Sequence, residues 1–151
     1  MCSSDLSAGT VTNDGNMNFQ TGIGNVGVYS INNGTATNNA SITVGASDPA
    51  TRRFAIGMAA GYLNEKSGTI ENYGTIQVTK DGSIGMYASG TGSRAINRGT
   101  IELSGKGVVG MYLDNNAVGE NYGTIKSIPN SENNGIVGVA ALNGSLLKNS
   151  Q

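Results

Sequence analysis

Apolar and polar residues alternate along this chain in short runs, and the runs return at a nearly regular interval. Residues 75–78 read Thr-Ile-Gln-Val and residues 100–103 read Thr-Ile-Glu-Leu, so the apolar side chains of each run share one face of an extended strand. Helical spacing is absent, and the density of Gly and Asn would make helices unfavourable. The pattern therefore predicts an all-β protein that consists of short strands.

Two short phrases recur along the sequence, Asn-x-Gly-Thr-Ile and (Ile/Val)-Gly-Met-Tyr. The glycine of the second phrase recurs in steps of 30, 28, 25 and 28 residues, at Gly27, Gly57, Gly85, Gly110 and Gly138. We assign the Thr-Ile part of the first phrase to residues 9–11, 40–42, 74–76, 99–101 and 123–125. A weaker element precedes it and ends in asparagine, at Asn38, Asn72, Asn97, Asn121 and Asn149. The chain thus contains about five units of three short strands.

A near-constant period of three strands favours a coil in which each turn lays one strand on each of three faces. Successive turns would then stack at about 4.8 Å, the spacing of paired strands. A single turn cannot bury its apolar face alone, whereas stacked turns bury a continuous column. The alternative is a series of antiparallel hairpins, for which the Asn-Gly pairs at residues 33–34, 134–135 and 143–144 are turn signals. Consecutive hairpins would not return like residues to equivalent positions, so we favour the parallel coil.

Stacking would place equivalent residues directly above one another. The asparagines would form a column of amide-to-amide hydrogen bonds at a sharp corner. The glycines would mark a bend where a Cβ would clash. We expect the apolar residues on both sides of each glycine to face the interior: Val26 and Val28, Ile56 and Met58, Ile84 and Met86, Val109 and Met111, and Val137 and Val139.

Three groups of residues are expected on the outer surface. Tyr29, Tyr87 and Tyr112 form an aromatic stripe that could contact a protein or a glycan, although outward tyrosines are also common in ordinary strands. Arg52 and Arg53 lie in the long loop of residues 44–54 and are a second candidate contact site. Two further outward columns consist of Tyr73, Arg98 and Tyr122, a cation–π arrangement, and of Gln77, Glu102 and Lys126.

Composition excludes several classes of function. Only 13% of the residues are charged, where about 25% is usual, and the net charge is −1, so nothing favours binding to nucleic acid or to an anionic membrane. No apolar run is long enough to span a membrane. Cys2 is the only cysteine, so an internal disulfide is impossible. Residues 1–8 lack the features of a signal peptide and are interpreted as disordered or artefactual, whereas residues 9–151 are interpreted as a repeat segment cut at both ends.

Candidate catalytic chemistry is also sparse, and we predict no enzyme activity, cofactor or metal site. The chain contains no histidine, which excludes a Ser-His-Asp triad and a His-ligated metal. Most carboxylates are expected in turns, although Glu71 and Glu120 would occupy equivalent positions two coils apart, with Ile96 between them. No environment that would raise a carboxyl pKa is evident, so this pair is not interpreted as an acid–base site.

The recurring phrases resemble the passenger repeats of large bacterial autotransporter adhesins over most of the chain. The resemblance implies a right-handed parallel β-helix that is displayed outside a Gram-negative cell and secreted through an outer-membrane barrel outside this segment. We therefore expect a structural and adhesive segment whose partner is a protein or glycan of a host or bacterial cell surface. The alternatives are a β-helical polysaccharide lyase or hydrolase, a phage tailspike fragment, and an inert spacer.

Overall fold

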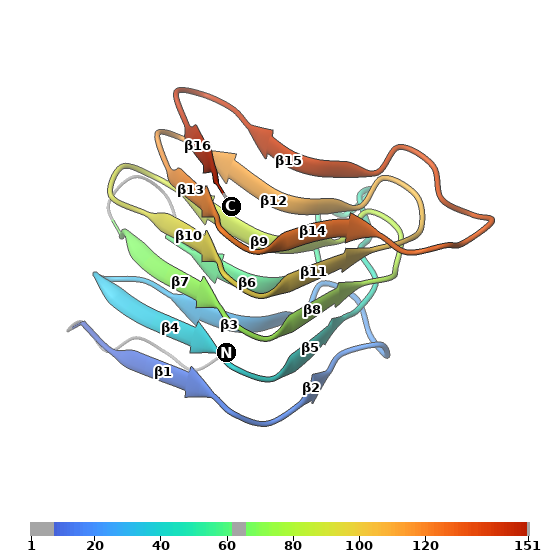
Figure 1. Ribbon diagram of the computed structural model, residues 1–151, viewed down its shortest axis with the longest axis horizontal. Coiled ribbons are helices and arrows are strands. Elements are labelled where there is room, and N and C mark those ends of the chain that lie inside the picture. The colour runs from blue at the N-terminus through green and yellow to red at the C-terminus, as the bar shows by residue number, and fades with distance from the viewer. Residues whose placement is uncertain (1–7, 62–65, 151) are drawn as a thin grey trace.

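Stacked parallel strands make up the fold. The computed structural model describes residues 8–61 and 66–150, and in these residues sixteen strands form three parallel sheets, with no helix. Each turn of chain contributes one strand to each sheet, and Figure 1 shows the turns rising from the blue N-terminal end to the red C-terminal end. In this view the chain passes from left to right along the front and returns behind while it rises, which is a right-handed path. The structure confirms the predicted β-solenoid of about five turns.

We name the three sheets after the residue that recurs in each. The asparagine sheet contains β1 (Thr10–Asn13), β4 (Gly34–Asn38), β7 (Gly68–Asn72), β10 (Arg94–Asn97), β13 (Val118–Asn121) and β16 (Leu146–Asn149). The isoleucine sheet contains β2 (Met17–Asn18), β5 (Ser41–Val44), β8 (Thr75–Val78), β11 (Thr100–Leu103) and β14 (Thr124–Ser127). The tyrosine sheet contains β3 (Val26–Ser30), β6 (Ile56–Ala60), β9 (Ile84–Ser89), β12 (Val109–Asp114) and β15 (Val137–Ala141).

Vertical columns of like residues fill the interior. In the isoleucine sheet Ile76 pairs with Ile101, and in the tyrosine sheet Met86 pairs with Met111; all four side chains are fully buried. Each coil thus buries its apolar residues against the coils above and below, because neighbouring strands lie only about 4.8 Å apart. The Asn-Gly pairs do not form hairpins: Asn33 has a positive φ of 61° at a corner between two strands of different sheets.

The first coil begins one strand earlier than the sequence pattern suggested. Residues 9–11 were assigned to the Thr-Ile phrase, but strand β1 pairs with β4 in the asparagine sheet, with Asn13 opposite Asn38. The Thr-Ile position of this coil is occupied by β2, where Met17 pairs with Ile42. The assignment was wrong because the first coil carries Asn13-Asp-Gly-Asn-Met17 where later coils carry Asn-x-Gly-Thr-Ile.

The residues on both sides of each glycine in the tyrosine sheet were predicted to face the interior, and this is wrong for the residue before the glycine. Met86 faces the core, whereas the residues that precede the glycines lie on the outer face, and Val26 and Val137 are 39% and 40% exposed. The cause is Gly85: a Cβ on this residue would point inward, 3.1 Å from Cγ2 of Ile101. Two consecutive residues therefore face the core, as in a β-bulge, and the alternation reverses before them. The same applies to Ile56, Ile84 and Val109, which are half-buried or covered on the outer side.

Some sequence-based expectations fall outside the described part of the chain. The expectations for residues 1–7, including Cys2, and for Gln151 concern residues that the structure does not describe. Ala8 is described and is exposed. Within the described ranges, the structure holds no helix that could cross a membrane.

Candidate functional site

A groove on the outer face of the tyrosine sheet is the candidate site. Its volume is about 530 Å³, and its floor is the outward apolar row that contains Ile56 and Ile84. The residues that line it are Val26, Tyr29, Arg52, Phe54, Ile56, Ala59, Gly61, Ile84, Tyr87, Tyr112 and Asp114. Its size is within the range of ligand sites, roughly 300–1,000 Å³, and its lining is mainly apolar, as such sites usually are.

Tyrosines stack along one side of this groove. Tyr87 pairs with Tyr112 in the register of β9 and β12, and their ring centroids are 5.8 Å apart with an interplanar angle of 20°. Tyr29 belongs to the same outer row, but Ala59 takes the position between Tyr29 and Tyr87. The small side chain of Ala59 therefore interrupts the row where the groove lies.

The long loop after β5 folds back to form the opposite wall. Asp48 and Arg53 form an antiparallel bridge, with Asp48 N donating to Arg53 O at 2.8 Å and Arg53 N to Asp48 O at 3.0 Å. The Asp48 side chain accepts hydrogen bonds from Thr51 Oγ1 at 2.7 Å and from Ala50 N at 3.1 Å. The Thr51 hydrogen bond is the main cause that lowers the pKa of Asp48.

This tight loop brings together two groups of residues that the sequence analysis treated as separate. Arg52, which adopts a positive φ of 56°, and the 42%-exposed Phe54 line the groove together with the tyrosines. Arg53 does not line it; the backbone of Gly24 lies against its Cβ instead. A second hollow of about 470 Å³ shares Phe54, Ile84 and Tyr112 with the groove.

A second cluster lies on the outer face of the asparagine sheet and at the adjoining corner. The Arg98 guanidinium lies 4.8 Å from the ring centroid of Tyr122 and 6.0 Å from that of Tyr73, which is the arrangement that the sequence suggested. Tyr122 Oη donates to Glu120 Oε2 at 2.6 Å, and Glu120 forms an ion pair with Arg94. The charged groups of this face therefore find partners within the face itself.

The carboxylate and the phenol in this cluster influence each other's protonation. The hydrogen bond from Tyr122, followed by that from Arg94, lowers the pKa of Glu120, which is only 7% exposed. The same hydrogen bond raises the pKa of Tyr122, because the phenolic proton is held between the two groups. Glu71 and Glu120 flank Ile96 in register on this outer face, at the equivalent positions two coils apart that the sequence predicted.

A ladder of asparagine amides runs through the corner beside this cluster. Each Nδ2 donates to the Oδ1 of the next coil at 2.8–2.9 Å, from Asn13 through Asn38, Asn72, Asn97 and Asn121 to Asn149. A second hydrogen bond fixes the side chains of the four inner asparagines to the backbone two residues later, for example from Asn38 Nδ2 to Ala40 O at 2.9 Å. Asn13 was missed by the sequence analysis for the reason given above.

The glycines of the tyrosine sheet also lie in one column. A Cβ on Gly57 would lie 2.7 Å from the carbonyl oxygen of Gly85, and one on Gly85 would lie 2.6 Å from that of Gly110. The same contact recurs from Gly27 to Gly57, and Gly110 faces Gly138 in the same way. Only at Gly138 is there room, where the nearest atom would be 4.0 Å away. The glycines therefore have a packing role beneath the groove.

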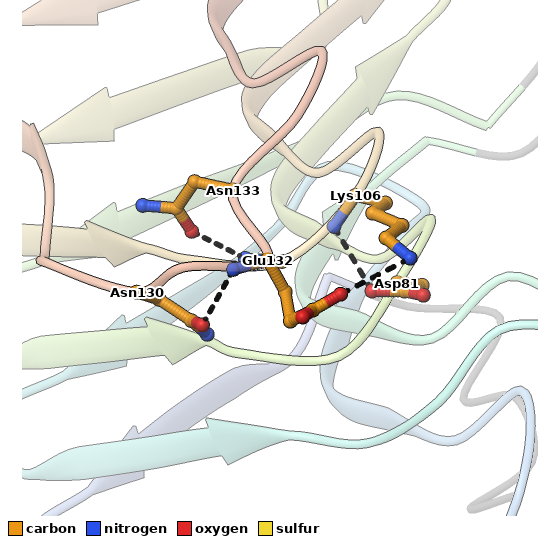
Figure 2. A network of polar contacts seen from close by, with 6 residues as sticks. Asp81, Lys106, Asn130, Glu132 and Asn133 are labelled. Atoms are coloured by element: carbon orange, nitrogen blue, oxygen red, sulfur yellow. Dashed lines mark hydrogen bonds and ion pairs between the residues drawn. The ribbon is translucent and has the colours of Figure 1, made fainter.

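Loops at the corner between the isoleucine and tyrosine sheets are joined by polar contacts, which Figure 2 shows. The Lys106 backbone N–H donates to Asp81 Oδ1 at 2.9 Å, and its ammonium lies 3.3 Å from Glu132 Oε2. Gly105 N donates to Asn133 Oδ1 at 2.8 Å. These contacts connect loops of three successive coils and leave each carboxylate with a partner. Among the described residues no group of three or more His, Cys, Asp or Glu could hold a metal ion.

These features define a class: a parallel β-solenoid repeat domain with an apolar groove on one outer face. Residues 1–121 match the family described as the BigA third pectate lyase-like domain. This match covers well over half of the 151 residues, so the chain belongs to that family. The description "pectate lyase-like" agrees with the stacked parallel strands, but a fold does not by itself imply an activity. No curated protein and no solved structure matches the chain.

Proposed function

We propose that this chain is a structural and adhesive segment of a bacterial cell-surface protein, and that the groove on the tyrosine sheet is its contact site. The observation that carries the proposal is the difference between the outer faces. The asparagine sheet pairs its charges internally, and on the isoleucine sheet Gln77 and Lys126 both bind the Glu102 carboxylate, each at 3.3 Å. The tyrosine sheet instead presents a partly exposed apolar row, in which Val26 is 39% exposed, beside stacked aromatic rings. Exposed apolar surface of this kind is typical of recognition sites.

The repetitive architecture also supports a role in display. A stacked solenoid adds length with each coil, and its loops and outer faces vary without disturbing the buried columns. Family membership and the resemblance to autotransporter passenger repeats support an extracellular location at a Gram-negative cell surface. The partner would be a protein or a glycan of a host or bacterial surface, with no nucleic acid and no insertion of this segment into a membrane.

Adhesion of coated beads to cells tests this proposal. Beads that carry the chain should bind host or bacterial cells, and Tyr87→Ser should reduce the number of bound beads by about tenfold, because aromatic side chains at a contact site contribute much of the affinity. Tyr73→Ser is the control, since Tyr73 is an exposed tyrosine outside the groove. Absence of binding, or equal losses in the two variants, would refute the assignment of the groove.

A polysaccharide-active β-helix is the second candidate. The observation in its favour is that Glu71, Arg94 and Glu120 share one outer face in a chain of a pectate lyase-like family. Against it, the lowered pKa of Glu120 is unsuited to a general acid, which requires a raised pKa. Incubation of the chain with acidic and neutral polysaccharides distinguishes an enzyme from an adhesive segment. Cleavage of a polysaccharide that is abolished by Glu120→Gln would establish an enzyme and refute the adhesive proposal.

A further inference from the structure

The chemistry of the groove points to a particular kind of ligand, and this inference rests on the proposed function. Most of the lining residues are apolar, including Val26, Ile56 and Ile84 on the floor and Phe54 on the wall. A carbohydrate carries a hydroxyl on most of its ring carbons, and each hydroxyl that is buried without a partner is costly. The floor provides few hydrogen-bonding groups for them. An apolar protein segment satisfies the groove better than a neutral glycan does.

The charge at the rim specifies the ligand further. Arg52 is the one cation among the described residues that line the groove, and within the described chain no ion pair to Arg52 is formed. Asp114, the acidic residue of the lining, already accepts a hydrogen bond from Asn143 Nδ2 at 2.7 Å. An unpaired guanidinium next to an apolar floor is complementary to a carboxylate, which it can bind through two parallel hydrogen bonds.

The dimensions set the length of the segment. The tyrosine row along the groove runs from Tyr29 to Tyr112 and crosses four coils, which corresponds to about 14 Å at the usual strand spacing. An extended chain advances about 3.3 Å per residue, so roughly four or five residues cover this distance. The open strand edges of the solenoid are at its two ends and not on this face, so recognition here depends on side chains and not on strand addition.

We propose that the groove binds an extended protein segment of about four or five residues that has apolar side chains at alternate positions and a carboxylate facing Arg52. The apolar side chains lie on the floor between Phe54 and the tyrosines, and Ala59 leaves the space that they occupy. A protein partner is therefore the ligand class of the adhesive site, and Arg52 determines its preference for an acidic sequence.

Parallel binding screens with the full 151-residue chain test this inference. One array carries short peptides with alternating apolar residues, each with and without an acidic neighbour, and the other carries neutral and acidic oligosaccharides. We expect binding to the peptides, with the acidic versions preferred by about three- to tenfold at low salt and less at high salt. Arg52→Gln should remove this preference, whereas Arg53→Gln, outside the groove, should keep it.

Filling the groove provides the second measurement. Ala59→Tyr should weaken peptide binding by about tenfold or more, while Ala140→Tyr, in the same row but outside the groove, should leave it unchanged. If Ala59→Tyr folds poorly, Phe54→Ser provides an independent test, because Phe54 is a half-exposed wall residue and its replacement should also weaken peptide binding. Peptide binding that survives both groove variants would overturn the site.

The two proposals fail in distinguishable ways. Binding to oligosaccharides but not to peptides, abolished by Ala59→Tyr, would refute the ligand class and leave the adhesive groove in place. A lack of binding to both arrays, together with beads that do not adhere to cells, would refute the proposed function as well. Peptide binding without any acidic preference would refute the role of Arg52 alone.

Discussion

The asparagine sheet and the tyrosine sheet are made by the same chain with the same period, yet their outer faces differ in kind. On the asparagine side, Glu120 is held by Tyr122 and Arg94, and Arg98 lies between two tyrosine rings. On the tyrosine side, an apolar row and a loop wall form a groove that Arg52 lines, and among the described residues Arg52 has no ion pair. Hydrogen bonds that are satisfied within one face contribute to stability, whereas apolar surface left exposed is available for a partner.

The origin of the difference is the glycine column. Because Gly85 takes an inward position directly beside the inward Met86, the residue before it is forced to the outer face. The asparagine sheet has no such irregularity, and its outer positions carry polar residues such as Glu71 and Glu120. A packing requirement in the interior has therefore placed a row of apolar residues on the outer surface of the tyrosine sheet.

Adding one methyl group to this column should have the largest effect on stability. Gly85→Ala would place a Cβ 2.6 Å from the Gly110 carbonyl oxygen, a backbone atom that cannot move without displacing the next coil. We expect a loss of about 3 kcal/mol or more in the free energy of unfolding, measured by urea denaturation. Gly138→Ala is the control, because its nearest contact is 4.0 Å, and it should change stability by less than about 1 kcal/mol. Equal effects would contradict the packing role of the column.

Interrupting the amide ladder should have the next largest effect. Asn97→Ala removes the acceptor of Asn72 Nδ2 and the donor to Asn121 Oδ1, and both partners are buried. Leaving buried polar groups without partners should cost about 2–4 kcal/mol, again by urea denaturation. Asn149→Ala removes a single ladder bond at an exposed position and should cost less than about 1 kcal/mol. If both variants were equally stable, the ladder would contribute nothing beyond the backbone.

Removing the charge of Glu120 on the asparagine sheet should have the smallest effect on the free energy of unfolding, and this effect should depend most on pH. A carboxyl whose pKa is lower in the folded chain stabilises the fold above its unfolded pKa, and this contribution is lost as the pH falls through the folded value. Glu120 has a lowered pKa, so Glu120→Gln should reduce stability by about 1 kcal/mol or less at pH 7 and by still less in acid.

The control for this measurement is Glu132→Gln, whose ion pair with Lys106 is exposed on both sides. It should not alter stability at either pH, because exposed pairs contribute little. A difference between the wild type and Glu120→Gln that is constant from pH 7 to pH 3 would show that the Glu120 charge does not stabilise this face.

The repeat in the sequence was sufficient to predict the stacked parallel strands, because Asn72, Asn97 and Asn121 return at the same place in successive units. The first coil was misplaced because Met17 and Asn16 replace the Thr-Ile pair on which the alignment depended. The outward position of Ile84 was missed because strict alternation was assumed to continue through Gly85, and only packing against the next coil reveals the bulge.

The groove itself could be predicted only in pieces. Tyr87, Tyr112 and Arg52 were each recognised as surface candidates, but their proximity depends on how the loop of residues 44–54 folds back. That path is determined by local contacts such as the Asp48–Arg53 bridge and the Thr51 hydrogen bond. Loop conformations of this kind leave no periodic signal, so Phe54 was not identified as a wall of the site.

The amide ladder has a direction. In each of the five bonds from Asn13 to Asn149, the earlier coil supplies the donor and the following coil supplies the acceptor. A coil that approached upside down would oppose donor to donor or acceptor to acceptor, so it could not join the stack without breaking the sequence of bonds. The solenoid therefore has a direction along its axis. Each completed coil specifies the orientation in which the next coil can add to it.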